Sequence, residues 1–362
     1  MPEFTPYDAV YTHDGETKKI HYLAAGPIDG PLIIFIHGWP GIGLTWKYQL
    51  RAFAALGFRA IAPDMPGYGD STSRRVKSDY SQEALVEGML ALLSANHRPS
   101  ALWVAHDWAA GVASSLAAHH PEVIQALVLM NVPYRSIELG LKHLASLVDR
   151  TIYPEDEYPF GNWDYMAYYE ESFEKCIAEE WDPNVETLCK LLYAPTPPET
   201  TSADASKPAF TANMRKNGGL FAGGPAPPPE ALPTPLLAGE VFDTLVQAMK
   251  KTGFWGATAY YMNHRENAAY NDSKALPNGA SLDKPVLFIH GEYDFVCATV
   301  GTRLADPMRE ACSNLTEVMV DAGHNVHAER PEKVNSAIAR FLVEQAKEYW
   351  PGYADTRYGE KA

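Results

Sequence analysis

Residues Val104–Gly111 read VAHDWAAG, and this stretch decides the fold. The apolar run that leads to Asp107 is typical of a buried strand, and a helical pattern begins directly after it. Small residues near Asp107 leave room for a sharp turn that presents its side chain at the end of the strand. They are Ala105, Ala109 and Gly111. Because serine is the usual nucleophile on such a turn, we ask what chemistry needs a carboxylate there.

The sequence around this stretch alternates between short apolar runs and helical patterns. This alternation predicts an α/β fold with a mostly parallel sheet flanked by helices. We expect further strands in LIIFIHG at Leu32–Gly38, RAIAPD at Arg59–Asp64, ALVLMNVP at Ala126–Pro133, KPVLFIHGEYD at Lys284–Asp294 and NLTEVMVDAGH at Asn314–His324. Helices are expected at about 44–56, 81–94, 108–120 and 331–349.

The alternation stops after Pro133 and returns only at Lys284. The block between them is rich in aromatic and acidic residues, and we expect a mainly helical insertion there. Its middle, from about Pro195 to Pro235, is rich in proline, which disfavours regular helix and central strand, so we expect a long loop. The predicted organisation is an α/β core in two parts, 1–133 and 276–362, with a helical cap at 134–275.

Composition and charge narrow the class of protein. The chain of 362 residues has a formal net charge of −15 and no basic run, which argues against nucleic acid or an anionic membrane as a partner. It lacks a run of about 18 apolar residues and a secretory leader pattern, so we expect a cytoplasmic protein without membrane insertion. We expect no metal and no cofactor, because the histidines form no ligand set and the four cysteines show no CxxC spacing.

Three residues with catalytic potential follow predicted strands at their carboxyl ends. Asp107, Asp294 and His324 occur in the chain order nucleophile, acid, histidine, and the carboxyl ends of parallel strands meet at one edge of a sheet. Each residue alone has a structural explanation, because aspartate is commonly a helix N-cap or a turn residue and a histidine can lie on the surface. Their occurrence at successive strand ends favours a shared site.

A carboxylate nucleophile suits one type of reaction. It needs no base for activation, but it attacks esters and amides poorly, so attack on an sp³ carbon is favoured. Such an attack leaves an ester on Asp107, which water must then hydrolyse. His324, held by Asp294, is the natural general base for that second step.

Several motifs resemble those of the soluble epoxide hydrolase family, which belongs to the α/β-hydrolase superfamily and is related to the haloalkane dehalogenases. They are HGWP, HDW, GEYDF and GH, with GGLF and KTGFWGATAYY in the insertion. The resemblance implies an α/β-hydrolase fold with a helical cap. It also implies that Asp107 is the nucleophile, His324 the base and Asp294 its orienting acid.

The same resemblance implies how an oxyanion and a substrate are bound. The backbone N–H groups of Trp39 and Trp108 would stabilise the oxyanion, and the Trp39–Pro40 peptide bond is expected to be cis. The side chains of Trp39, Trp108 and Tyr165 would contact the substrate.

In this family two cap tyrosines polarise the epoxide oxygen, and the segments WDYMAYY and GATAYY match their positions. We assign the pair to Tyr168 and Tyr261, although Tyr165, Tyr169 and Tyr260 are close enough that a shift of alignment would exchange them. The alternative is that these rings are ordinary cap packing, because aromatic residues at helical spacing usually form a core.

Two other functions stay open. A haloalkane dehalogenase would use the same nucleophile, but Trp39 stands where one dehalogenase group has a halide-binding asparagine, and Asn131 stands where that group has its acid. A non-catalytic binding protein of the same fold would have no need of the three residues Asp107, Asp294 and His324. The expected partners are a small apolar epoxide and water, and the sequence does not indicate the oligomeric state.

Overall fold

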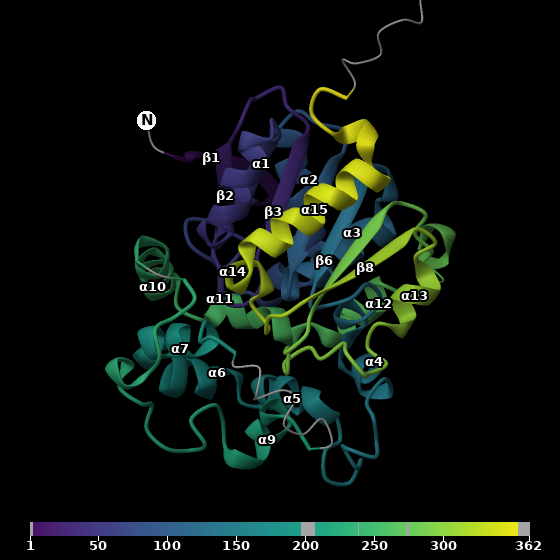
Figure 1. The fold of residues 1–362 in the computed structure, drawn as a ribbon. Coiled ribbons are helices and arrows are strands. Elements are labelled where there is room, and N and C mark those ends of the chain that lie inside the picture. The colour runs from purple at the N-terminus through teal and green to yellow at the C-terminus, as the bar shows by residue number, and fades with distance from the viewer. Residues whose placement is uncertain (1–2, 197–206, 238, 273, 275, 354–362) are drawn as a thin grey trace, which may run out of the picture.

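An eight-stranded sheet forms the centre of the structure, a computed structural model that describes residues 3–196, 207–237, 239–272, 274 and 276–353 (Figure 1). The strands lie in the order β1-β2-β4-β3-β5-β6-β7-β8. Their bounds are β1 (Thr5–His13), β2 (Glu16–Ala25), β3 (Leu32–Ile36), β4 (Arg59–Pro63), β5 (Ala101–His106), β6 (Ile124–Met130), β7 (Val286–Gly291) and β8 (Leu315–Val320). The strands from β4 to β8 pair in parallel, which confirms the predicted mostly parallel sheet.

Strands β1 and β2 form an antiparallel hairpin that also pairs antiparallel with β4. The hairpin turn contains Asp14 and Gly15, which both have positive φ angles, of 50° and 74°. An Asp-Gly pair in this conformation makes a tight turn whose twist matches the flanking strands. The dipeptide is therefore the sequence signal for a hairpin that our strand assignments did not include.

Helices cover both faces of the sheet. Helices α1 (Lys47–Ala55) and α15 (Pro331–Gln345) share one apolar cluster with one face, whereas α2 (Gln82–Ala95) and α3 (Trp108–His119) share the other cluster. Successive residues of β3 point to opposite faces and are fully buried in both, which explains its uninterrupted apolar sequence. Two shorter helices, α13 (Asp306–Ala311) and α14 (Val326–Glu329), flank β8 in the chain.

The segment between β6 and β7 is mainly helical where it is described, as predicted. It lies beyond one end of the sheet (Figure 1). Its helices are α4 (Gly140–Ser146), α5 (Asp164–Glu171), α6 (Phe173–Lys175), α7 (Val185–Leu192), α9 (Phe210–Asn217), α10 (Glu240–Thr252), α11 (Trp255–Thr258) and α12 (His264–Tyr270), with a π-helical turn at Cys176–Trp181. No helix in the described ranges is long and apolar enough to cross a membrane.

The proline-rich stretch is not a continuous loop. Residues 197–206 lie outside the described residues, but α9 occupies Phe210–Asn217 within the stretch that we expected to be irregular. The eight residues of α9 include no proline, so the prolines on either side limit the helix without preventing it. From Gly218 to Leu237 the backbone is irregular apart from a single 3₁₀ turn at Pro229–Ala231.

Candidate active site

Asp107 occupies a strained turn between β5 and α3. Its φ and ψ angles are 54° and −130°, a conformation that non-glycine residues rarely adopt and that stores backbone strain. The turn directs the carboxylate toward the loop after β3, where Gly38 leaves space because a Cβ there would collide with the Asp107 side chain. The structure therefore places Asp107 on the sharp turn that the small residues around it predict.

Of the three residues expected to act together, His324 lies within hydrogen-bonding reach of both aspartates. His324 Nδ1 lies 3.0 Å from Asp294 Oδ2, and His324 Nε2 lies 3.3 Å from Asp107 Oδ2. The backbone N–H of Trp39 donates to Asp107 Oδ1 at 2.7 Å. The Trp39–Pro40 peptide bond is cis, as expected. Trp108 begins α3, where the first N–H groups of a helix have no partner within it.

Asp294 is held by donors that sequence reasoning did not identify. The backbone N–H groups of Val296 and Cys297 donate to Oδ1 at 2.8 and 3.1 Å, and Asn131 Nδ2 donates to Oδ2 at 2.7 Å. We had considered Asn131 only as a residue that cannot replace an acid. Asn131 directly follows β6, and β6 pairs with β7, the strand that leads to Asp294, so the strand order gives the signal for this contact.

The charges of this cluster are coupled. Burial alone would lower the pKa of His324, but the adjacent Asp294 and Asp107 carboxylates raise it to about 10. Burial would likewise raise the pKa values of the two aspartates, but the His324 imidazolium outweighs burial and keeps both below their usual value of 3.8. The free site at neutral pH is therefore an imidazolium between two carboxylates.

Other histidines near the site are structural and neutral. Burial lowers the pKa of His37 and of His106 to about 4. His106 Nε2 donates to the backbone carbonyl of His324 at 2.7 Å, and His37 Nε2 accepts the N–H of Met65 at 2.9 Å. Through these contacts His106 packs behind the turn that carries Asp107, and His37 braces the loop that carries Trp39.

The charge of Asp107 acts on several buried tyrosines, and two of them, Tyr165 and Tyr261, come from the cap segments identified in the sequence. Burial raises the pKa values of Tyr165 and Tyr261, and the charge of Asp107 raises both further. Their ring centroids lie 6.2 Å apart, and the Tyr261 ring packs edge-on against Trp108 at 4.7 Å. Among the described residues, the hydroxyl of Tyr165 has no hydrogen-bond partner.

The structure does not place the hydroxyl of Tyr168 with those of Tyr165 and Tyr261. Its hydroxyl donates to Glu180 Oε1 at 3.0 Å, and its pKa is raised by burial and then by Cys176 and Glu180, without a contribution from Asp107. Tyr165 and Tyr168 lie three residues apart on α5. Because three residues complete slightly less than one turn of an α-helix, the two side chains point in directions about 60° apart. Tyr169, the next residue, directs its hydroxyl toward Met214 Sδ at 3.6 Å.

Aromatic rings from the cap surround Trp39. Its ring centroid lies 5.6 Å from that of Trp181 and 6.0 Å from those of Phe254 and Tyr261. Trp181 was not identified from the sequence, and Phe254 appeared there only within the motif KTGFWGATAYY. Both come from cap segments far from Trp39 in the chain. The arrangement gives the site an apolar wall, which suits a substrate with little polar surface.

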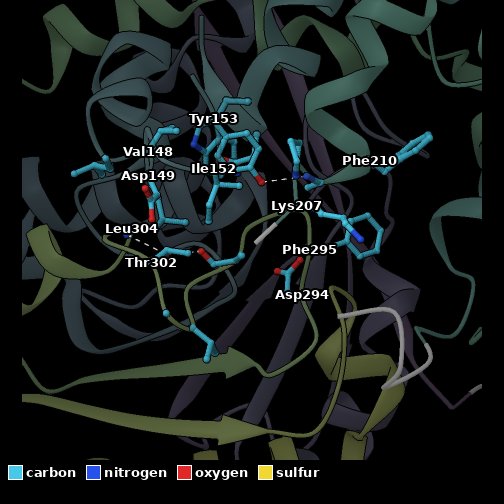
Figure 2. A pocket seen from close by; sticks show the side chains of 18 of the residues that line it. Val148, Asp149, Ile152, Tyr153, Lys207, Phe210, Asp294, Phe295, Thr302 and Leu304 are labelled. Carbon is cyan, nitrogen blue, oxygen red and sulfur yellow. Dashed lines mark hydrogen bonds between the residues drawn. The ribbon is translucent and has the colours of Figure 1, made fainter. Parts of the chain in front are cut away.

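A cleft of about 840 Å³ adjoins the site at Asp294. Figure 2 shows Asp294 and Phe295 on one side, with Val148, Ile152 and Phe210 across from them. Phe210 and Phe295 are exposed, at 49% and 38%, although large apolar side chains are usually covered. Asp107, Tyr165 and Tyr261 are not among its lining residues, so the cleft borders the candidate site at Asp294.

Within the described residues, few groups of side chains could hold a metal ion. Among the described residues, two groups bring three potential ligand atoms within 4.8 Å of one another, and one of them is Asp294, Cys297 and His324 of the site itself. In the other, both carboxylate oxygens of Asp64 accept backbone N–H groups, from Gly43 and Asp70, and His21 contacts Asp8. These bonds fold the loop after β4, and we assign no ligand to the group.

Comparison with known proteins gives the same fold and a similarity to epoxide hydrolases. A family model described as alpha/beta hydrolase fold matches residues 31–179. The rat protein named bifunctional epoxide hydrolase 2 is 30% identical over 327 residues, which cover 90% of this chain and 53% of that protein. Epoxide hydrolase A of Mycobacterium tuberculosis is 28% identical over 91% of this chain and 96% of its own length.

The structural comparison agrees. The crystal structure of epoxide hydrolase A from Mycobacterium thermoresistibile matches with a TM-score of 0.74 and 26% identity, over 94% of this chain and 99% of the other. The chain is thus an α/β-hydrolase-fold protein. Within that fold, it resembles the epoxide hydrolases along about nine-tenths of its length, although it spans only about half the length of the first curated relatives that it matches.

Proposed function

We propose that this protein is an epoxide hydrolase, which adds water to a small apolar epoxide to give a vicinal diol. The observation that carries the proposal is the carboxylate of Asp107 on the strained turn, with the Trp39 N–H on one oxygen and His324 at the other. In this reading residues 134–275 are a cap over a core formed by 1–133 and 276–362, and the protein needs neither metal nor cofactor.

The first step is attack of Asp107 on an epoxide carbon. The ring C–O bond breaks, an ester bond forms between Asp107 and the carbon, and the ring oxygen takes up the negative charge and is then protonated from solvent through the tyrosine hydroxyls. We pair Tyr165 with Tyr261 as the donors to that oxygen, replacing Tyr168, because the charge of Asp107 raises the pKa values of these two hydroxyls and not that of Tyr168. As the charge leaves Asp107, one cause of their raised pKa values disappears and they donate more readily.

The second step is hydrolysis of the ester. Once Asp107 is esterified it carries no charge, so one of the two carboxylates that raise the pKa of His324 is lost and the imidazole can become neutral. His324, oriented by Asp294, then takes a proton from water as the water oxygen attacks the Asp107 carbonyl carbon. The N–H groups of Trp39 and Trp108 are the proposed oxyanion donors. The ester C–O bond then breaks, His324 gives its proton to the leaving diol oxygen, and Asp107 releases the other water proton to solvent as it returns to a carboxylate.

The test is turnover of a panel containing styrene oxide, a fatty-acid epoxide and 1-bromobutane, with diol and bromide measured separately. Diol formation by the wild-type protein that is lost in Asp107→Ala is the expected result. Bromide release without diol would favour haloalkane dehalogenation, and no product from any substrate would favour a binding protein.

A further inference from the structure

The end of cap helix α7 contacts two catalytic loops at once. Tyr193 directly follows α7, and its hydroxyl donates to the backbone carbonyl of Pro40 at 2.7 Å. The carbonyl of Leu192, the last residue of α7, accepts a hydrogen bond from Asn325 Nδ2, also at 2.7 Å. Thr196 packs so closely on Gly323 that a Cβ at Gly323 would collide with its side chain.

Each of the two hydrogen bonds involves a residue that directly follows a residue of the site in the chain. Pro40 follows Trp39, whose N–H donates to Asp107, and Asn325 follows His324. Tyr193 and Asn325 are buried, at 3% and 7% exposure, so water competes little for either bond. The Asn325 side chain makes no capping bond to α14, which it precedes, so its amide is directed to the cap instead of to its own helix.

The same segment is tied into the cap. The Tyr193 carbonyl accepts the N–H of Leu236 at 2.8 Å, and the Tyr193 N–H donates to Cys189 within the last turn of α7. Trp39 and His324 are 285 positions apart in the chain, and the cap segment lies between them in sequence. A single short cap segment therefore links the oxyanion loop and the histidine loop through side-chain and backbone bonds.

We propose that residues Leu192–Thr196 form a latch, with Tyr193 and Asn325 as positioning residues that set the Trp39 N–H and His324 relative to each other. Neither residue touches the reacting atoms. The catalytic consequence rests on the proposed function, in which ester hydrolysis uses the Trp39 N–H and His324 together, whereas ester formation depends mainly on Asp107 and the tyrosines. Loosening the latch should therefore slow hydrolysis more than alkylation.

The first experiment compares Tyr193→Phe with Tyr134→Phe, a matched control. Tyr134 is also buried, and its hydroxyl also donates to a backbone carbonyl, that of Ala280, at 2.8 Å, but away from the site. In rapid-quench mass spectrometry with styrene oxide, Tyr193→Phe should slow ester hydrolysis about 10-fold, alter alkylation less than about twofold and raise the steady-state ester fraction. Equal slowing of both steps, or the same rates as Tyr134→Phe, would overturn the latch.

The second experiment does not depend on turnover. Hydrogen–deuterium exchange should increase in Tyr193→Phe for both residues 37–41 and residues 321–325, and should stay at the wild-type rate there in Tyr134→Phe. Asn325→Ala should do the same, and the double variant should add little, because either change opens the same latch. Unchanged exchange in both loops would refute the latch even if the protein proved inactive on epoxides, and Asn325→Ala provides the measurement if Tyr193→Phe does not fold.

Discussion

The sheet edge and the cap build opposite walls of one site by different means. At the sheet edge, Asp107 and Asp294 follow strands that are fixed by backbone hydrogen bonds to their neighbours, and their carboxylates are further held by N–H donors. On the cap side, Tyr165 and Tyr261 stand on short helical segments and are located by packing of aromatic rings. We infer that the sheet edge fixes the reacting group, whereas the cap is the wall in which substitutions can change the substrate.

The largest effect is expected from breaking the sheet-edge wall at Asp107. Asp107→Ala removes the only group that can form the ester, so diol formation should fall by at least about 10⁴-fold. The variant is compared with Asp164→Asn, which alters a buried cap carboxylate that accepts the N–H of Phe160. Diol formation by Asp107→Ala at more than a hundredth of the wild-type rate would remove Asp107 from the mechanism.

Two substitutions on α5 test which cap tyrosine donates to the epoxide oxygen. Tyr165→Phe should slow alkylation about 10- to 1000-fold, because it removes a donor whose hydrogen bond strengthens as charge develops on the epoxide oxygen. Tyr168→Phe should leave alkylation within about threefold of wild type, because it removes only the bond to Glu180. Single-turnover kinetics distinguish them, and a larger loss in Tyr168→Phe would restore the assignment made from the sequence.

A smaller effect is expected at Asn131, which donates a hydrogen bond to Asp294 at the sheet edge. Asn131→Gly removes the donor to Asp294 Oδ2 but tolerates the positive φ of 65° at this position. Ester hydrolysis should slow about 10-fold, because Asp294 then orients His324 less firmly. Measurement of both half-reactions decides the matter, since slowing of alkylation alone would show that Asn131 acts elsewhere.

The smallest effect concerns stability and pH. The pKa of His324 is raised from 6.5 to about 10, so its ion pairs stabilise the fold fully below about pH 6.5, and this contribution is lost as pH rises through 10. The aspartates have pKa values below 3.8, so their contribution is lost only as pH falls through those lowered values.

His324→Gln should therefore unfold more easily than wild type by about 1 kcal/mol near pH 6, and the difference should shrink toward pH 10. Denaturant titrations of both proteins across this range give the two free energies of unfolding. A difference that stays constant between pH 7 and 10 would show that His324 is already neutral in the folded protein at pH 7.

The two walls also differ in how far the sequence predicts them. The proximity of Asp107, Asp294 and His324 was predictable, because the alternating pattern marks the strands and the carboxyl ends of parallel strands lie at one edge of the sheet. The choice between the cap tyrosines was not predictable, because residues three and four apart on a helix are neighbours. Tyr168 is distinguished from Tyr165 by its contact with Glu180, which the sequence does not reveal. The hydrogen bonds of Tyr193 and Asn325 were not predictable either, because they join segments that lie far apart in the chain.

The central claim is that Asp107 forms an ester which His324 resolves, and one measurement tests it directly. His324→Gln is incubated with saturating styrene oxide, and the protein is then digested and analysed by mass spectrometry. The account predicts an adduct of one substrate mass on the peptide that contains Asp107, with little diol released. No adduct on that peptide, or undiminished diol formation without one, would contradict it.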